Sequence, residues 1–330
     1  MRRIALGEDG MSSSVLGFGC SAVMGRVGRK ASLAALAAAY DAGITLYDTA
    51  RSYGYGEGEG LLGEFLQGRR ESVVISTKFG ILPARSSRFK RALMPVVRGL
   101  LRLTPGARGM MQKQIAAQFS AGNFSVATLK ESLEASLRAL RTDYVDLLFL
   151  HEAAVSVMQQ EDLFAALEGV VAEGKVRRFG MASQPAVVEA AVAAGMRTIQ
   201  CPCNMFELGM VGRLASGGGV VAIASQPFGG GNKIVESKAL LGTITQDRSA
   251  PGTLREKLRV VDDEVLADVV LNMITRDTGI QVVVPSMLRV DHVRANVAAV
   301  ENSRFSAEEL RWLREAIGET RLPQDSEAPS

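Results

Sequence analysis

The chain has 330 residues, of which 47% are hydrophobic and 22% are charged, and its formal net charge is +3 at pH 7. This composition is typical of a globular protein and excludes a wholly disordered, collagen-like or heptad-repeat chain. No apolar run approaches the roughly 18 to 20 residues of a membrane-spanning helix, and residues 1–9 lack the apolar core of a signal peptide. We therefore expect no stable membrane insertion and a cytoplasmic location.

Short apolar segments alternate with helical patterns along most of the chain. The expected strands are residues 15–19, 44–47, 73–77, 145–150, 176–181, 198–201, 219–224 and 280–284. The expected helices are residues 32–42, 59–67, 126–140, 161–173, 185–194, 254–277 and 290–300, with a weaker helical pattern at 206–215. This alternation indicates repeated βα units.

Eight strands that alternate with helices, with no second compositional region, favour a closed (β/α)8 TIM barrel over an open doubly wound sheet. The length agrees, because such barrels take about 250 residues plus insertions. We predict an α/β fold with a single barrel domain over residues 1–330. Its additions are a long insertion after the third strand at 81–125, a loop at 227–253, a C-terminal helix at 307–317 and a polar tail at 319–330.

The predicted insertion is strongly basic. Residues 81–125 contain eight basic residues and no acidic one, which leaves 30 basic against 35 acidic residues in the rest of the chain. Such a segment fits an anionic ligand, a phosphate group or a lipid surface, and it equally fits a solvated insertion. Interleaved aromatic residues are scarce, so we expect no nucleic-acid partner. Because the insertion follows Lys78, we hypothesise that it favours anionic carbonyl substrates or binds the phosphates of the cofactor. Neutralising Arg85, Arg88 and Arg91 would test this hypothesis.

Cysteine and histidine are too few for a metal or disulfide framework. The chain has three cysteines and two histidines, and Cys201 and Cys203 lie one residue apart without CxxC spacing or a neighbouring histidine. Reduced thiols and no metal site are therefore expected.

Polar residues with catalytic chemistry follow three successive predicted strands. Asp48 and, five residues later, Tyr53 follow the second strand, Lys78 ends the third, and His151 ends the fourth. The carboxyl ends of the strands build the active site of a (β/α)8 barrel, so these side chains are expected on one rim.

These four residue types together can transfer a proton. A free phenol has a pKa of about 10, which is too high for efficient proton exchange near neutrality. We predict that the Lys78 ammonium lowers the pKa of Tyr53 and that the Asp48 carboxylate keeps Lys78 charged. His151 remains to donate a hydrogen bond to the oxygen that receives the proton.

The segments around these residues resemble the aldo-keto reductase family. The matching stretches are residues 46–56 with Glu59 and 62–63, 75–78 and 143–152, followed by 174–180, Ser183, 200–204, 285–286 and Asn296. The resemblance covers nearly the whole chain. It implies a (β/α)8 barrel that binds NADP(H) and reduces aldehydes or ketones, with Asp48, Tyr53, Lys78 and His151 as the catalytic tetrad.

The same resemblance implies a set of cofactor-binding residues. They are Gly19 and Cys20 near the nicotinamide ribose, Ser183 and Gln200 near the carboxamide, Ser225 and Pro227 in the loop over the pyrophosphate, and Ser286, Arg289 and Asn296 at the adenosine end. A small buried thiol is the other interpretation of Cys20. Arg289, helped by Arg294, favours NADP(H), with NAD(H) as the alternative.

Two other functions fit the same residues. The first is an NADP-binding, redox-sensing regulatory subunit with little turnover, similar to the potassium-channel β subunits. The second is a different barrel enzyme that acts on a phosphorylated metabolite and binds no nicotinamide. All four tetrad positions are filled, which favours an enzyme whose partner is a small-molecule carbonyl substrate.

Overall fold

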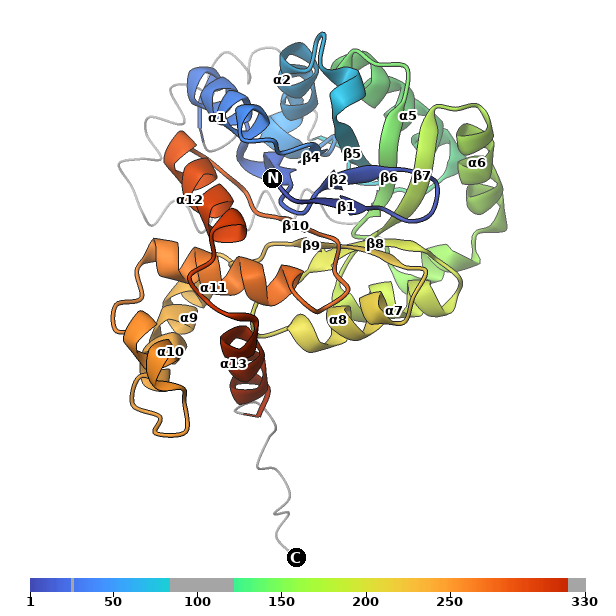
Figure 1. Cartoon of the computed structure of the whole chain (residues 1–330). Helices are drawn as coiled ribbons and strands as arrows, with labels where there is room; N and C mark the ends of the chain where they lie inside the picture. Colours follow the sequence, from blue (N-terminus) through green and yellow to red (C-terminus); the bar gives the residue numbers. More distant parts are fainter. Residues whose placement is uncertain (25–26, 84–121, 320–330) are drawn as a thin grey trace, which may run out of the picture.

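Eight strands form one sheet that closes into a barrel (Figure 1). The computed structural model describes residues 1–24, 27–83 and 122–319. The strands of this sheet are β3 (Phe18–Gly19), β4 (Leu46–Asp48), β5 (Val74–Phe79), β6 (Val145–His151), β7 (Val176–Ala182), β8 (Thr198–Pro202), β9 (Val221–Ser225) and β10 (Val282–Val284). Neighbours pair in parallel, and the order in the sheet is the order along the chain. The predicted (β/α)8 TIM barrel is therefore confirmed.

Backbone hydrogen bonds between β10 and the segment of β3 close the barrel. The Gly17 amide donates to the Val283 carbonyl at 2.9 Å, and the Gly19 amide donates to the Pro285 carbonyl at 3.0 Å. A Cβ atom on Gly19 would lie 2.9 Å from that Pro285 oxygen. The closure thus depends on a residue without a side chain at this position.

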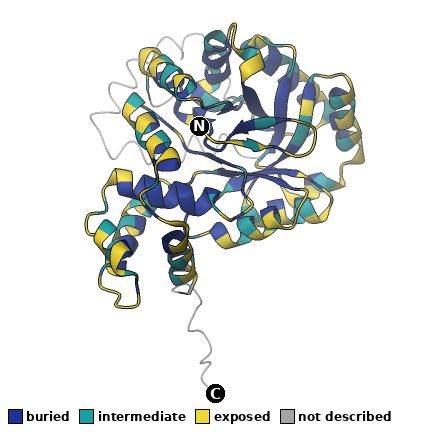
Figure 2. Ribbon diagram, in the orientation of Figure 1, coloured by how far each residue is buried: buried dark blue, intermediate teal, exposed yellow. Residues whose placement is uncertain are grey.

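Helices surround the barrel, and most of them have one buried and one exposed face (Figures 1 and 2). They are α1 (Arg29–Asp41), α2 (Gly58–Phe65), α5 (Val126–Leu140), α6 (Glu161–Ala172), α7 (Pro185–Ala193), α8 (Leu208–Ser216), α9 (Gly231–Ile244), α10 (Gly252–Lys257), α11 (Asp263–Thr275), α12 (Val290–Glu301) and α13 (Ala307–Glu319). Every residue of α11 from Val265 to Thr275 is buried, because this helix also packs against α12 and α13.

Two predictions about the C-terminal half are wrong. The expected loop at 227–253 contains α9, of which only Ser237, Leu241 and Ile244 are buried and which begins at the third of three successive glycines. The expected single helix at 254–277 is two helices, α10 and α11. The break occurs where the Asp262 side chain accepts a hydrogen bond from the Val265 amide at 2.8 Å and so begins α11 as an N-cap.

The sequence patterns also missed an antiparallel hairpin that covers the amino-terminal end of the barrel. Its strands are β1 (Arg3–Ala5) and β2 (Ser12–Ser14). Leu6 and Met11 between them join the interior cluster that includes the first residues of four barrel strands, namely Leu46, Val74, Val221 and Val282. The hairpin therefore seals the end of the barrel opposite to the carboxyl ends of its strands.

Parts of the prediction lie outside the described residues. These are most of the insertion at 81–125, including all eight of its basic residues, and the tail from residue 320 onward. Among the helices that the structure describes, none has both the length and the apolar composition needed to cross a bilayer. The assignment of residues 1–330 to a single domain remains a prediction.

Helix α2 packs against the backbone of α5 through a glycine, which generates a stability prediction. A Cβ on Gly63 would lie 2.5 Å from the Ala139 carbonyl oxygen, whereas a Cβ on Gly60 meets nothing within 4 Å. Gly63→Ala should lower the free energy of unfolding by about 1 to 3 kcal/mol, because the two helices must separate. Gly60→Ala, the matched control in the same helix, should raise it by up to about 1 kcal/mol. Urea denaturation checks both, and equal effects would contradict this packing.

Candidate active site

Three of the predicted tetrad residues occupy inward positions at the carboxyl ends of adjacent strands. Side chains alternate between the two faces of a strand. Leu46 on β4, Val74 on β5 and Phe149 on β6 belong to the interior cluster of the barrel. Counting in steps of two from these residues reaches Asp48, Lys78 and His151, which therefore point into the mouth of the barrel. The alternation of side chains along each strand thus places apolar residues inside the barrel and these three polar residues at its mouth.

Asp48 and Lys78 form a buried ion pair. The Lys78 Nζ atom donates to both carboxylate oxygens of Asp48 at 2.7 Å and to the Thr49 carbonyl at 2.9 Å. The Ser76 hydroxyl also donates to Asp48 Oδ1 at 2.7 Å. Burial opposes the charge of Lys78, but Asp48 and Tyr53 outweigh it and raise the pKa of the ammonium. Lys78 therefore remains protonated at neutral pH.

Tyr53 enters the site from the loop that follows β4. It begins a short 3-10 segment, η2 (Tyr53–Gly56), in which Gly54 has φ 60°. A Cβ on Gly54 would lie 2.4 Å from the Val23 carbonyl oxygen, so the loop passes too close to its neighbour for a side chain there. The centre of the Tyr53 ring is 4.9 Å from Lys78 Nζ and 6.0 Å from the centre of the His151 ring. The structure thus brings all four residues together.

The pKa of Tyr53 differs from the prediction in its net direction. Burial raises the pKa of the phenol, Lys78 lowers it, and the net pKa is raised. The predicted effect of the lysine is present, but the loss of hydration outweighs it in this cavity. The phenol therefore keeps its proton at neutral pH.

His151 is neutral in this site. Burial, assisted by the positive charge of Lys78, lowers its pKa to about 3. Its Nδ1 atom is buried and has no hydrogen-bond partner among the described residues. A neutral imidazole can donate one hydrogen bond to an oxygen placed in the cavity.

A buried carboxylate holds the loop that carries Tyr53. Glu59, in the first turn of α2, accepts hydrogen bonds from the Thr77 hydroxyl at 2.6 Å and from Arg51 at 2.9 Å. Glu59 is only 1% exposed. These contacts join both sides of the Tyr53 loop to β5 next to Lys78, so Glu59 positions the loop.

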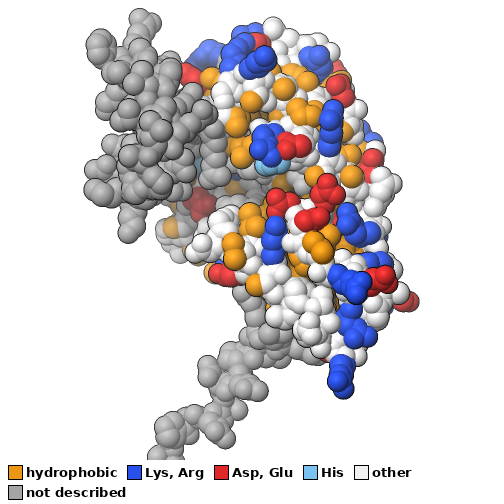
Figure 3. All heavy atoms as spheres, turned by 90° about the vertical axis from the view of Figure 1, so that its left-hand side faces the viewer, with side chains coloured by type: hydrophobic (Ala, Val, Ile, Leu, Met, Phe, Trp, Pro, Cys, Tyr) orange, Lys and Arg blue, Asp and Glu red, His pale blue; other side chains and the backbone are white. Residues whose placement is uncertain are grey.

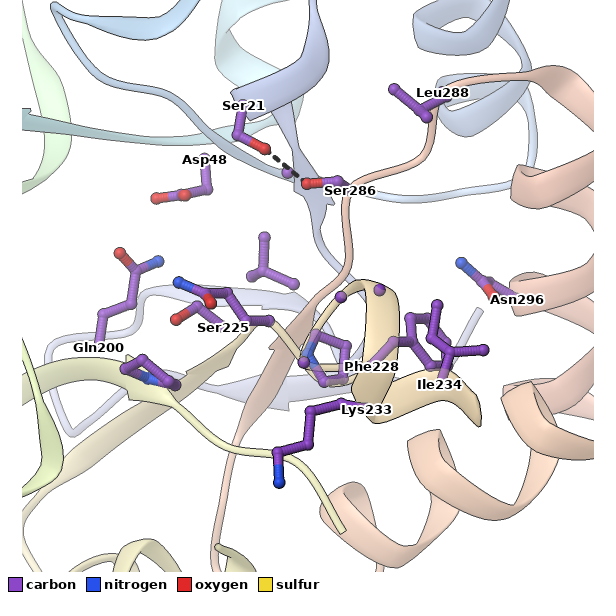
Figure 4. A pocket seen from close by; sticks show the side chains of 18 of the residues that line it. Ser21, Asp48, Gln200, Ser225, Phe228, Lys233, Ile234, Ser286, Leu288 and Asn296 are labelled. Carbon is purple, nitrogen blue, oxygen red and sulfur yellow. Dashed lines mark hydrogen bonds between the residues drawn. The ribbon is translucent and has the colours of Figure 1, made fainter. Parts of the chain in front are cut away.

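A cavity of about 960 Å³ opens beside the four residues. Figure 4 shows that it extends from Asp48 and Gln200 at the strand ends to Ile234 and Asn296 between α9 and α12. The predicted cofactor residues that line it are Gly19, Ser183, Gln200, Ser225, Pro227, Ser286 and Asn296. These residues come from five different strand ends and from α12, and only the barrel brings them together.

Two predicted cofactor residues are not brought to the cavity wall. Cys20 is fully buried, its Sγ atom lies 3.9 Å from the Phe18 carbonyl, and burial raises the pKa of the thiol. This matches the interpretation of Cys20 as a small buried thiol. Arg289 does not line the cavity, because its guanidinium binds both carboxylate oxygens of Asp291 at 3.0 and 2.7 Å.

The cavity also has lining residues that the sequence did not predict. They include Ser21, Phe228, Lys233, Asp263, Leu288 and His292. The Ser21 and Ser286 hydroxyls are 2.6 Å apart across the barrel closure. The glycine run at 229–231 before α9 was a signal for part of this wall, since glycine-rich turns before helices commonly bind phosphate.

The lining fits a nicotinamide dinucleotide. The cavity volume is within the range of about 300 to 1,000 Å³ that small-molecule and cofactor sites occupy. Gln200 Nε2 is buried at its wall and has no partner among the described residues, so a donor is available for a carboxamide oxygen. The amino-terminal end of α9 follows glycines and faces the cavity, where it can bind phosphate oxygens.

Comparisons with known proteins point to one family. A model of the Aldo/keto reductase family matches residues 15–317. Aldo-keto reductase YhdN from Bacillus subtilis (strain 168) is 27% identical over 217 residues, which are 63% of this chain and 55% of that protein. NADH-specific methylglyoxal reductase from Escherichia coli (strain K12) is 26% identical over 272 residues, which are 78% of this chain and 74% of that protein. The structure of aldo-keto reductase AKR11C1 from Bacillus halodurans (holo form) gives a TM-score of 0.69 at 22% identity over 96% of each chain.

The fold and the family match define the class of this protein, a (β/α)8 barrel of the aldo/keto reductase family. The chain belongs to the aldo/keto reductase family, as its motifs predicted. It spans about half of the length of YhdN in their match, and its likeness to AKR11C1 concerns the fold.

The buried neutral His151 predicts a pH-dependent stability. Its pKa is about 3 when folded and 6.5 in the free side chain, so the unfolded chain binds more protons between these values. Stability should therefore fall as the pH is lowered through this window, by up to about 1.4 kcal/mol per pH unit from this residue. His151→Asn should remove that part of the slope, which urea denaturation between about pH 7 and pH 5 measures. Identical slopes for the two proteins would contradict a buried neutral imidazole.

Proposed function

We propose that this protein reduces aldehydes or ketones to alcohols, or catalyses the reverse reaction, with a nicotinamide dinucleotide as cofactor. The observation that carries the proposal is the position of Tyr53 beside Lys78 and His151 at one end of the dinucleotide-sized cavity. A phenol, an ammonium paired with a carboxylate and a neutral imidazole are the groups that protonating a carbonyl oxygen requires.

Each residue has a separate part in the proposed mechanism. Tyr53 donates its proton to the carbonyl oxygen of the substrate. Lys78 stabilises the phenolate that remains, and Asp48 keeps Lys78 charged and directed toward Tyr53. His151 donates a hydrogen bond to the same carbonyl oxygen and orients it. When bound, the cofactor supplies the hydride that adds to the carbonyl carbon.

The remaining lining residues are proposed to hold that cofactor. Ser183 follows β7 and Gln200 lies on β8, the two strands after β6, and both residues are assigned to the nicotinamide carboxamide. Ser225, Pro227 and the glycine run that follows them are assigned to the pyrophosphate. Ser286 and Asn296 are assigned to the adenosine end. Gly19 pairs with Ser286 and has no side chain, so the cofactor can approach the backbone closely at this position.

The named relatives support a small carbonyl compound as the substrate. The Escherichia coli protein carries the name of a methylglyoxal reductase that is specific for NADH. The sequence favoured NADP(H) because of Arg289, with NAD(H) as the alternative, so both nucleotides have to be tested.

The role of Tyr53 is tested by removing one oxygen atom. Tyr53→Phe should lower turnover by about 10² or more, because the proton donor is lost, and should leave cofactor binding nearly unchanged. Steady-state oxidation of NADPH and NADH with a panel of small aldehydes measures the turnover, and nicotinamide fluorescence measures binding.

The matched control is Tyr47→Phe on β4. Tyr47 is fully buried, and its hydroxyl has no partner among the described residues. This substitution should leave turnover unchanged. An active Tyr53→Phe variant would refute the proposed mechanism. Cofactor binding by the wild type without turnover on any aldehyde would favour the redox-sensing subunit instead.

A further inference from the structure

The two ends of the cavity have different chemistry, and the difference bears on which dinucleotide it accepts. This inference rests on the proposed function. Tyr53 and His151 line one end of the cavity, so the nicotinamide must lie there for hydride and proton to reach the same carbonyl group. The adenosine must then lie at the other end, between α9, α11 and α12, where Figure 4 shows Ile234, Leu288 and Asn296.

The charged side chains at the adenosine end already have partners. Lys233 Nζ lies 3.0 Å from Glu236 and 5.0 Å from the centre of the Phe206 ring. Asp263, on the same wall, lies 2.6 Å from Lys238. In the middle of the described part of this side of the molecule, basic and acidic side chains are intermixed (Figure 3).

Arg289, which the sequence assigned to the adenosine end and which favoured NADP(H), with its 2′-phosphate, is directed away from the cavity. Ser286 and Leu288 line the cavity, whereas Met287 and Arg289 do not. This alternation is that of an extended segment, and Arg289 has φ −144° and ψ 160°. Its guanidinium is held by both oxygens of Asp291. Leu288 therefore presents an apolar side chain to the cavity next to the arginine.

We propose that the cavity prefers NAD(H) to NADP(H) and that Leu288 is the specificity-determining residue. A 2′-phosphate carries about two negative charges, and it binds well only where a guanidinium, an ammonium or several N–H groups replace its water. In the described wall of the adenosine end, Leu288 and Ala295 are apolar, Asp263 is acidic, and the ammonium of Lys233 is paired. The other polar side chains there are those of Ser286, His292 and Asn296, which include neither a guanidinium nor an unpaired ammonium. The adenosine ribose of NAD(H) carries hydroxyls only, so it does not need a positively charged group in the wall.

The first test is direct binding in the absence of any aldehyde. The purified protein is titrated with NADH and separately with NADPH, and nicotinamide fluorescence gives each dissociation constant. NADH should bind at least about tenfold more tightly, the factor that one lost charge-assisted contact implies. Equal binding, or tighter binding of NADPH, would overturn the inference.

Variants at two adjacent residues identify the determinant. Leu288→Arg should tighten NADPH binding by about tenfold and leave NADH binding within about twofold, because it adds a guanidinium to the wall. Leu288→Met, which is neutral and of similar volume, should change neither. Arg289→Ala should leave the ratio of the two dissociation constants unchanged. A selective loss of NADPH binding in Arg289→Ala would show that Arg289 binds the 2′-phosphate and would overturn the inference.

The failure of this inference is distinguishable from the failure of the proposed function. If neither nucleotide binds to the wild type, both fall together. If NADPH binds more tightly and supports turnover, the carbonyl reductase proposal stands and only the preference for NAD(H) is overturned.

Discussion

The buried ion pair between Asp48 and Lys78 is the interaction on which the rest of the site depends. Both side chains are almost completely withdrawn from water, and an unpaired ammonium in that position would lose its proton. The pair is charged because the carboxylate accepts two bonds from Lys78 and one from Ser76, and because the Thr49 carbonyl accepts another from the ammonium. The charge of Lys78 lowers the pKa of both Tyr53 and His151, although burial is the larger cause of the shift in each.

The pair in turn depends on the register of the barrel. Asp48 is opposite Ser76 in the pairing of β4 with β5, so Lys78 is the next inward residue beyond it and can reach back to the carboxylate. The hairpin of β1 and β2 seals the barrel below, and the contacts of Glu59 with Thr77 and Arg51 hold the loop above. The Tyr53 ring is therefore placed by elements that are themselves closely packed, as the proposed proton transfer requires.

The sequence predicted those parts of the fold in which the spacing of apolar residues determines the secondary structure. Apolar runs located all eight barrel strands, and alternation within them brought the residues at their carboxyl ends to one rim. The prediction failed for β2, which is three serines held by pairing with β1, and for the break before α11, where Val260 continues the apolar pattern although it is 71% exposed. Lys233, Asp263 and His292 were also missed, since only the closed barrel brings α9, α11 and α12 to one cavity.

The structure differs from the prediction in the net pKa of Tyr53 and in the position of Arg289. The two differences have a common physical origin. Sequence identifies a charge and its neighbours along the chain, but electrostatic effects depend on direction and on hydration. Arg289 is one residue from Leu288, yet the extended backbone turns it away from the cavity and toward Asp291. Lys78 does lower the pKa of Tyr53, yet burial raises it further. In the proposed mechanism the phenol thus holds its proton at neutral pH, where reduction needs a proton donor. Lys78 lowers the free-energy cost of losing that proton. The oxidation of an alcohol requires the phenolate, so at neutral pH the free site holds Tyr53 in the protonation state that reduction uses.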